Sequence, residues 1–432
     1  MNISLRFTSN TGHGARWTKT LTVVILTCAM CTACSQTGMP EQAQTPSKKA
    51  LIKFVASEYS TATKPMLENL IRQFEANNPL IHVELQVANW DILDGVYTAM
   101  ISKNQPPDLL NTNIYAHFAK DGLLLDFNTV LSDQLKSKFY ANFMHMDQLE
   151  GRQFAIPYFS SIRNLYYNKD LFNNAGLTKP PKTWSELEAA ASVIKLSSKA
   201  HGFGVDLSDN EIQAYLSYFF FGSGGGWIKN GKWVINSPEN VQGLTYLKDL
   251  FDRGLTDPEP TVTTRDEKQR ILGDGKLGMM ISGNYFTSVV PKEFPGLKWG
   301  VGPIPVKDGQ PPISFGVQDV LVAFKTDHTD KEAIARFLDF LYDDANYEQM
   351  TLREGFLPVT KPVGDKLSSD SVIKDNLDNL RNAKFYPIDN PVWSAVMDAS
   401  RTMGQAVLYD HLSPKAALDQ LQQFAETRSS QK

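Results

Sequence analysis

Hydrophobic and polar residues follow two different periods along the first part of the chain. Residues 51–56 form a short apolar run, and residues 81–87 are apolar at every second position, as in β-strands. Apolar positions within residues 66–74 and 93–101 recur at intervals of three and four, which is helical spacing. A third strand is expected to begin at residues 108–110. The order β-α-β-α-β predicts a parallel sheet with helices on its faces.

The stretch from Ile156 to Tyr167 is apolar and aromatic almost throughout, which predicts a strand too aromatic for the edge of a sheet. Asn168 is placed to cap a short helix, and Gly176 to end it in the left-handed conformation. Thr183-Trp184-Ser185-Glu186 has the spacing of a capping box, so another helix should begin there. A buried strand followed at once by new helices predicts a bridge between two lobes.

The second part of the chain repeats the alternation of helices and strands. A helix is expected from Ser237-Pro238-Glu239, and residues 266–272 also have helical character. Residues 277–281 predict a buried strand. The apolar stretch 313–324 predicts the return crossing between the lobes, with Gly316, Val317 and Gln318 near the hinge.

Polar caps mark further helix starts. Thr63 is expected to cap the first helix, with Pro65 in its first turn. Residues 334–341 form an amphipathic helix. Asn390-Pro391-Val392-Trp393 opens another helix, and Ser413-Pro414 starts the last one.

The chain has 432 residues, about three times the usual domain size, so two domains are expected. We predict an α/β protein with two lobes, each a sheet flanked by helices, joined by hinge crossings. The first lobe is expected to hold residues 50–158 plus 315–365, and the second residues 159–314 plus 366–432.

The N-terminal 33 residues differ from the rest of the chain. Arg6, Arg16 and Lys19 precede an apolar core at residues 21–30. This core is too short to span a bilayer comfortably. Thr32-Ala33-Cys34 resembles a bacterial lipobox, although Cys31 stands where leucine is usual. These features predict a lipoprotein-type signal peptide over residues 1–33 and lipidation of Cys34, with ordinary secretion as the alternative. Residues 34–49 lack periodicity and are expected to form a flexible tether.

Charge and cysteine content exclude several classes of site. The formal net charge is −4, and removing the three basic residues of the leader leaves −7. Such an acidic body argues against nucleic acid or anionic lipid as a partner. All three cysteines lie at or before Cys34, so the rest of the chain holds no disulfide, zinc thiolate site or thiol nucleophile. Neither a metal nor a cofactor is expected.

Signs of catalysis are weak in the sequence. The seven histidines do not occur in His-x-x-x-His or His-Glu arrangements, and a Gly-x-Ser-x-Gly elbow is absent. Acidic pairs such as Asp343-Asp344 are expected on solvated helix surfaces. We therefore predict no catalytic step, while a pair of carboxylates acting on glycosidic bonds stays open as an alternative.

The carboxyl ends of the predicted strands carry flat aromatic and amide side chains. In open parallel sheets, ligands lie beyond these ends. Aromatic planes cover the apolar face of a sugar ring, while amides and carboxylates bind its hydroxyls. For Trp90, packing at the helix cap is the alternative to ligand contact. The ligand-binding residues predicted from these strand ends are Glu58, Tyr59, Trp90, Asp91, Asn111 and Asn113.

Several motifs resemble the sugar-type bacterial extracellular solute-binding proteins, the relatives of maltose-binding protein. They are Tyr166-Tyr167-Asn168-Lys169-Asp170-Leu171-Phe172 with the following Ala175-Gly176-Leu177, Gly275 to Gly283, Gly355-Phe356-Leu357-Pro358-Val359, and Pro391-Val392-Trp393. The similarity runs in order from about residue 51 to about residue 425. It implies a two-lobed periplasmic-binding-protein fold of type II.

The resemblance adds further candidates for contact with a ligand. Core packing is about equally expected for the aromatic residues before and after the glycine-rich turn at residues 224–226. Arg163 and Gln318 are polar candidates for which a structural ion pair or hydrogen bond is the alternative. The candidates that the resemblance implies are Tyr215, Tyr218, Trp227, Asn284, Tyr285 and Trp393.

By this resemblance, the chain is expected to be an exported, monomeric, lipid-anchored receptor. It would capture a sugar or oligosaccharide and deliver it to the permease subunits of an ABC importer. The alternatives are a protein of the same fold that binds a polyamine, organic acid or metal chelate, or a surface-anchored carbohydrate-active enzyme. A polyamine site requires two or more carboxylates, and only Glu58 and Asp91 are expected near the strand ends.

Overall fold

The computed structural model describes residues 49–208 and 211–431. The predicted signal peptide, Cys34 and the tether up to residue 48 lie outside the described residues.

One sheet of eight strands runs through the described unit. Its order is β2-β1-β3-β12-β6-β10-β7, and β11 pairs with β6 as well. The other strands form two short antiparallel hairpins, β4-β5 and β8-β9. The strands are β1 (Ala50–Ser57), β2 (Ile81–Ala88), β3 (Leu109–Thr112), β4 (Gln148–Leu149), β5 (Arg152–Gln153), β6 (Ala155–Asn168), β7 (His201–Gly204), β8 (Ile228–Lys229), β9 (Lys232–Trp233), β10 (Leu277–Gly283), β11 (Trp299–Gly302) and β12 (Gly316–Ala323).

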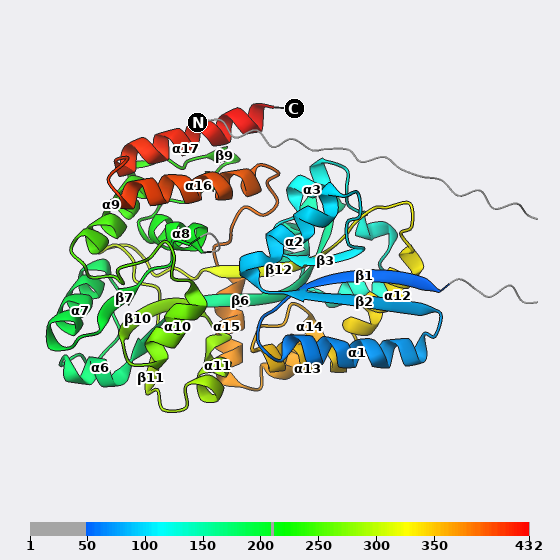
Figure 1. Cartoon of the computed structure of the whole chain (residues 1–432), viewed down its shortest axis with the longest axis horizontal. Helices are drawn as coiled ribbons and strands as arrows, with labels where there is room; N and C mark the ends of the chain where they lie inside the picture. The colour runs from blue at the N-terminus through cyan, green and yellow to red at the C-terminus, as the bar shows by residue number, and fades with distance from the viewer. Residues whose placement is uncertain (1–48, 209–210, 432) are drawn as a thin grey trace, which may run out of the picture. The chain divides into compact units, whose positions relative to one another are not determined.

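The strand β6 belongs to both parts of this sheet, as the aromatic stretch predicts. Its first part pairs with β12 between Ala155 and Ile162, and its second part pairs with β10 and β11 from Arg163 onward. All three pairings are antiparallel. Figure 1 shows β6 in the middle, with β12 beside it. β6 is buried along most of its length and β12 along all of it, so both strands run through the interior and connect the two sets of strands.

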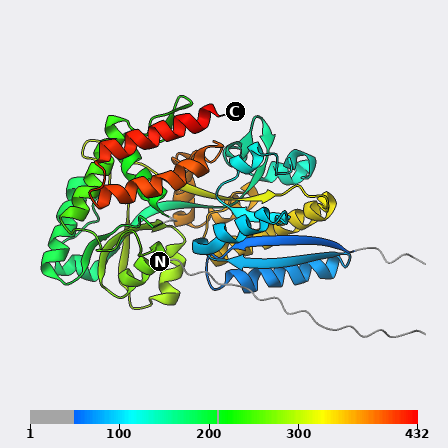
Figure 2. The ribbon, with the colours of Figure 1, turned by 45° about the horizontal axis from the view of Figure 1, so that its top comes forward.

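The first strands confirm the predicted β-α-β-α-β order. β1 pairs in parallel with β2 and β3. Helices α1 (Thr63–Asn77) and α2 (Trp90–Ser102) lie on opposite faces of these strands, as Figures 1 and 2 show. Their apolar stripes enter two different core clusters, and burial of each stripe fixes the helix to its face.

Most of the predicted helix caps are confirmed. Asn168 accepts hydrogen bonds from the backbone of α6 (Lys169–Asn174), and Gly176 has a φ of 71°. Thr183 and Glu186 form a capping box at α7 (Trp184–Ser197). The prediction for Thr63 is wrong: its Oγ1 accepts from the backbone N–H groups of Tyr59 and Ser60, at 2.9 and 3.0 Å, and donates to Glu354. The hydroxyl therefore orders the loop that follows β1 and accepts no hydrogen bond from the first backbone amides of α1.

The other helices pack around the sheet. α16 lies along α17 and against α8 and α9, and Figure 1 shows this layer in red, orange and green. The remaining helices are α3 (Ala116–Lys120), α4 (Asp133–Lys138), α5 (Ala141–Met146), α8 (Ile212–Gly222), α9 (Pro238–Asp252), α10 (Arg265–Gly273), α11 (Phe286–Glu293), α12 (Lys331–Leu341), α13 (Asp344–Glu354), α14 (Lys361–Leu367), α15 (Ser371–Arg381), α16 (Trp393–Leu408), α17 (Pro414–Ser430) and the 3₁₀ turn η1 (Phe127–Thr129).

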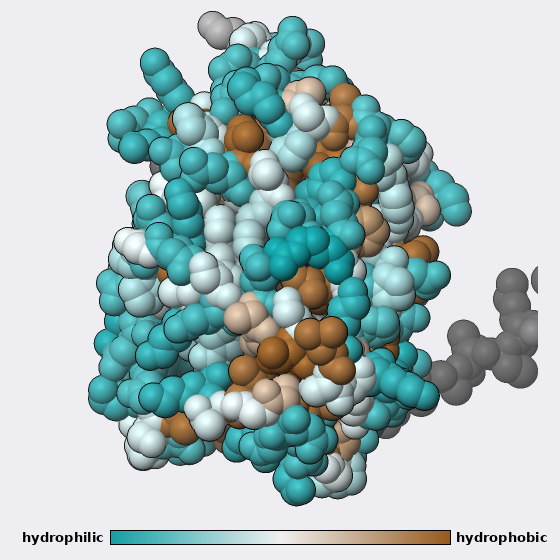
Figure 3. All heavy atoms as spheres, turned by 90° about the vertical axis from the view of Figure 1, so that its left-hand side faces the viewer, coloured by the Kyte–Doolittle hydropathy of each residue, from teal (hydrophilic) through white to brown (hydrophobic). Residues whose placement is uncertain are grey.

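The fold class is the predicted α/β class, with a central sheet flanked by helices. The residue boundaries assigned to the lobes from the sequence stay a prediction. The face seen in Figure 3 is mainly hydrophilic, with hydrophobic areas between the polar side chains. Within the described residues, the helices are too short or too polar to cross a bilayer.

Candidate functional site

A cavity of about 420 Å³ lies where several strand ends meet. Its wall is formed by the loop after β1, the start of α2, the middle of β6 and β12, the start of α10 and the exit of β10. This is the edge at which an open α/β sheet is expected to bind a ligand. The predicted site residues that line this cavity are Glu58, Tyr59, Trp90, Asp91, Asn113, Arg163 and Tyr285.

Three predicted amide residues do not line the cavity, because their polar groups hold the strands in place. Asn111 Oδ1 accepts from Ser57 N at 3.2 Å and from Tyr59 Oη at 3.0 Å. Asn284 accepts from Ile162 N at 3.0 Å, and Gln318 Nε2 donates to a buried carboxylate at 2.8 Å. These bonds satisfy the amides of Asn111 and Asn284, whereas Gln318 Oε1 is without a partner among the described residues. Ligand contact through these three residues stays a prediction.

Four predicted aromatic residues pack in the core. Tyr215 Oη donates to Gly204 O at 2.9 Å, and Trp227 Nε1 donates to Ser217 Oγ at 2.7 Å. Tyr218 meets a phenylalanine ring edge-on. These three residues are buried and do not line the cavity, and ligand contact through them stays a prediction.

Trp393 is the fourth of these aromatic residues. It is 2% exposed and lies between the rings of Trp227, at 5.0 Å, and Tyr386, at 5.6 Å. Tyr386 stacks on it with an interplanar angle of 23° and lines the cavity in its place. Trp393 therefore lies behind the cavity wall, next to a residue that lines it, and ligand contact through Trp393 stays a prediction.

Aromatic rings form one side of the cavity. Tyr59 meets Trp90 with ring centroids 6.0 Å apart and Phe356 at 4.7 Å. Tyr285 lies 5.1 Å from Phe356. Phe356 lies in the Gly355-to-Val359 motif that resembles the family, but it follows a helix and not a strand end, so the sequence did not predict that it would line the cavity. The four rings offer flat apolar surface to a ligand.

A cluster of two arginines and a glutamate also belongs to the wall. Glu211 Oε1 accepts a short hydrogen bond from Arg265 Nη1 and lies 3.7 Å from Arg163 Nη2. The guanidinium of Arg265 also lies over the ring of Tyr285, at 5.6 Å. Sequence reasoning missed Glu211 and Arg265. The Thr264-x-x-Glu267 capping box was the available signal, since it places Arg265 in the first turn of α10.

Polar groups of this cluster are left without partners among the described residues. Arg163 is 6% exposed, and its Nε and Nη1 atoms have no hydrogen-bond acceptor there. Tyr285 Oη is likewise unpaired and 8% of the residue is exposed. Buried polar groups are nearly always satisfied, because leaving one unpaired costs about 1–3 kcal/mol. Both residues line the cavity, but the unpaired atoms themselves are covered by protein, so a ligand oxygen would satisfy them after a small movement of the wall.

Asp319 lies in the crossing strand β12, next to an irregularity in its pairing with β6. Its Oδ2 accepts from Tyr59 Oη at 2.9 Å, and the residue is 5% exposed. Burial raises the pKa of Asp319 to about 7, against the opposing effects of the Tyr59 hydrogen bond and of Arg163 and Arg265. Burial likewise raises the pKa of Asp206, another residue of the wall, to about 6.

Replacing Asp319 with asparagine is expected to flatten the decline of stability between about pH 5 and pH 8. The native carboxyl has a pKa of about 7, whereas an unfolded one titrates near 3.9. The native state therefore binds more protons in this interval, and the free energy of unfolding falls as the pH rises. Asparagine does not titrate and still accepts from Tyr59. Urea denaturation at several pH values should show a contribution on the order of 2–4 kcal/mol; identical slopes in both proteins would contradict it.

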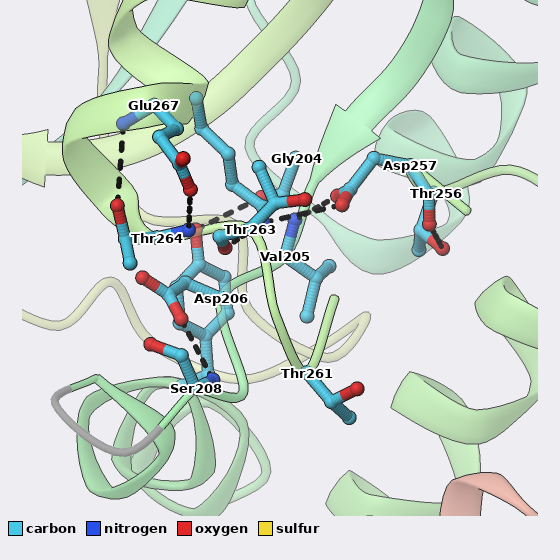
Figure 4. Close-up of polar contacts among 12 residues, drawn as sticks. Gly204, Val205, Asp206, Ser208, Thr256, Asp257, Thr261, Thr263, Thr264 and Glu267 are labelled. Atoms are coloured by element: carbon cyan, nitrogen blue, oxygen red, sulfur yellow. Dashed lines mark hydrogen bonds and ion pairs between the residues drawn. The ribbon is translucent and has the colours of Figure 1, made fainter. Parts of the chain in front are cut away.

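The helix α10, which carries Arg265, is anchored from below by a buried lysine. Lys268 is fully buried, lies 3.2 Å from Asp257 Oδ2 and donates to Thr263 O. Asp257 Oδ1 accepts from Val205 N at 2.8 Å. Figure 4 shows Asp257 pointing toward Val205, with the Thr264–Glu267 capping box nearby. These bonds tie the start of α10 to the end of β7.

Among the residues that the structure describes, His, Cys, Asp and Glu side chains form no group of three or more that could hold a metal ion.

Comparison with known proteins identifies the family. The model of the bacterial extracellular solute-binding proteins matches residues 56–348. A binding protein of Brucella abortus (strain 2308) is 31% identical over 373 residues, which are 85% of this chain and 90% of that protein. The sn-glycerol-3-phosphate-binding protein UgpB of Shigella dysenteriae is 27% identical over 63% of this chain and 60% of its own length.

Solved structures of the same fold agree with this match. Maltose-bound MalE3 of T. maritima superposes with a TM-score of 0.77 at 23% identity, covering 88% of this chain and all of that one. The GacH receptor of Streptomyces glaucescens, solved also with acarbose, gives 0.76 at 21% identity over 88% and 98%. The chain therefore belongs to the bacterial extracellular solute-binding proteins, the substrate-binding components of ABC importers.

Proposed function

We propose that the protein captures a sugar or oligosaccharide between its two lobes and passes it unaltered to the permease subunits of an ABC importer. A lipid on Cys34 would hold it at the outer side of a membrane. One observation carries the proposal: a single cavity combines four aromatic rings with buried polar groups that have no partner among the described residues. The maltose and acarbose bound to proteins of the same fold support it.

The energetics of sugar capture fit such a wall. Micromolar binding requires about 8 kcal/mol, while one hydrogen bond contributes only about 0.5–1.5 kcal/mol. Several hydrogen bonds must therefore act together with ring stacking. Arg163 and Tyr285 supply hydrogen-bond donors to the wall. Tyr59 and Trp90 supply apolar surface to it.

Closure of the lobes follows from the placement of these groups. Tyr59 and Trp90 follow β1 and β2, whereas Arg163 and Tyr285 lie where β6 pairs with β10. A ligand that touches both groups binds the closed form more tightly than the open one, which shifts the population toward closure. β6 and β12 are the segments about which the lobes would move, as in hinge-type binding proteins.

A second candidate, a positively charged solute, is favoured by the charge of the cavity. The expectation that only Glu58 and Asp91 would be available is wrong, because loops and helices distant in sequence contribute carboxylates as well. A non-sugar cation therefore has the carboxylates that it requires. The additional carboxylates in the wall are Asp94, Asp206, Glu211, Asp266, Glu267, Glu293 and Asp319.

A thermal-shift screen against mono- and oligosaccharides tests the proposed function. A ligand at 100 times its dissociation constant stabilises by about 2.7 kcal/mol. Replacing Trp90 with alanine is expected to abolish the shift and leave the unfolding of the free protein unchanged, because Trp90 is only half-buried. Tyr409→Ala is the matched control, since Tyr409 is 49% exposed and does not line the cavity. Absence of a shift with every sugar, or an undiminished shift in Trp90→Ala, would count against the proposal.

A further inference from the structure

Acidic side chains dominate the cavity. Nine aspartates and glutamates line it, against three arginines, and lysine and histidine are absent from its wall. Such a wall repels anions and concentrates cations. Because acidic residues are common on protein surfaces, the number alone does not define a ligand, and the contacts of the individual groups decide.

Two of the three arginines of the wall are already neutralised in large part. Glu211 is shared by Arg163 and Arg265. Arg265 also lies 3.1 Å from Asp266 Oδ1. Beside these matched charges, the wall holds one further arginine, Arg270, and seven further acidic side chains, so its charge balance is negative and disfavours an anionic ligand.

Asp319 provides a buried acceptor beside aromatic rings. Its single hydrogen bond within the described residues comes from Tyr59 Oη, at 2.9 Å. Tyr59 meets the ring of Trp90 and the ring of Phe356 edge-on. A carboxylate next to aromatic rings suits a protonated amine, which the charge attracts and the ring faces stabilise further.

The unpaired donors of the wall require oxygen atoms on the same ligand. Arg163 Nε and Nη1 and Tyr285 Oη are buried without partners among the described residues, and both residues line the cavity. A guanidinium N–H group only donates, so its partner must carry a hydroxyl, ether or carbonyl oxygen. An aliphatic polyamine has no such oxygen and would leave Arg163 unsatisfied.

We propose that the solute is an amino sugar, whose protonated amine lies toward the carboxylates around Asp319 and whose hydroxyl and ring oxygens lie toward Arg163 and Tyr285. The inference rests on the proposed capture of a sugar in this cavity and specifies the class of sugar. No covalent step is involved.

Titration calorimetry at about pH 7.5 with matched ligands tests the inference. The panel holds glucose, galactose and mannose, their 2-amino and 2-acetamido forms, chitobiose and its deacetylated form, and putrescine and spermidine. We expect an amino form to bind at least about tenfold more tightly than both its parent and its acetamido form, because a charged hydrogen bond is lost in each.

The outcomes separate the inference from the proposed function. Equal affinity for the neutral and amino forms would overturn the amino-sugar inference and leave sugar capture intact. Binding of spermidine without any sugar would overturn both and establish a polyamine receptor. If no member of the panel binds, both proposals fail.

Variants locate the amine. Asp319→Asn is expected to lower the affinity for the amino sugar at least about tenfold more than the affinity for the neutral parent. Asp327→Asn is the matched control, since Asp327 is exposed and does not line the cavity. Should Asp319→Asn fail to fold, the unaltered protein decides: raising the salt concentration should weaken amine binding selectively, because salt screens charge. Salt dependence equal for both ligands would overturn the inference.

Discussion

Replacing Lys268 with methionine is expected to lower the free energy of unfolding by about 3–5 kcal/mol, which is the typical cost of breaking a buried ion pair. Lys268 is fully buried, and its partner Asp257 is 3% exposed. Burial raises the pKa of Asp257 above its usual range, and the charge of Lys268 opposes that shift. Without the lysine, the carboxylate is left with the Val205 amide as its main partner.

The effect of Lys268→Met should depend on pH in a defined direction. Removing Lys268 raises the native pKa of Asp257 further, so the native state of the variant binds more protons than the unfolded chain. The variant is therefore expected to lose more stability at about pH 8 than at about pH 5. Urea denaturation at both values measures the difference.

Two control proteins sharpen this experiment. Lys276→Met removes a lysine that is 70% exposed and paired with an exposed aspartate, so it should change stability by less than about 1 kcal/mol. The double variant Lys268→Met/Asp257→Asn should regain part of the loss, because no charge then stays buried alone. Equal losses in the single and double variants would show that the packing of the lysine stem, and not the ion pair, stabilises α10.

Replacing Glu211 with glutamine is expected to cost about 3–5 kcal/mol as well and to weaken ligand binding at least about tenfold. Glu211 is the shared partner of Arg163 and Arg265. In the variant two guanidinium groups face each other in a cavity wall without a neutralising charge. Their repulsion would move Arg163, which lines the cavity.

A double variant distinguishes repulsion between the arginines from a lost hydrogen bond. Glu211→Gln/Arg265→Gln removes one positive charge along with the negative one, so stability should recover by about 1–2 kcal/mol relative to Glu211→Gln. If the double variant is less stable than the single one, the repulsion is not the cause of the loss. Titration calorimetry with the tightest-binding member of the sugar and amine panel measures binding, and urea denaturation measures stability.

Local features of the chain could be predicted because they depend on neighbours in sequence. The caps formed by Asn168 and Thr183 use hydrogen bonds to residues within the first helical turn. The amphipathic stripes of α1 and α12 are read from residues three and four positions apart. Thr63, which was wrongly predicted to cap α1, donates its hydroxyl hydrogen bond to Glu354, 291 residues away. Side-chain hydrogen bonds over such separations leave no pattern in the sequence.

The candidate site shows the same division. Tyr59, Trp90 and Tyr285 follow strand ends directly, and the rule that ligands lie beyond such ends places them in the wall. Glu211 and Arg265 follow no strand directly. Their contact joins segments 54 residues apart, which the order of residues does not disclose.

The sequence by itself determined the α/β class, the order of strands and helices, and the buried strand common to both lobes. Hydrophobic period and capping chemistry act over a few residues, so they can be read along the chain. Only the tertiary structure decided that the cavity is acidic, that Tyr386 covers Trp393, and that Arg163 keeps unpaired donors. The charge of the cavity and the burial of its residues depend on segments far apart in sequence, and only folding brings those segments together.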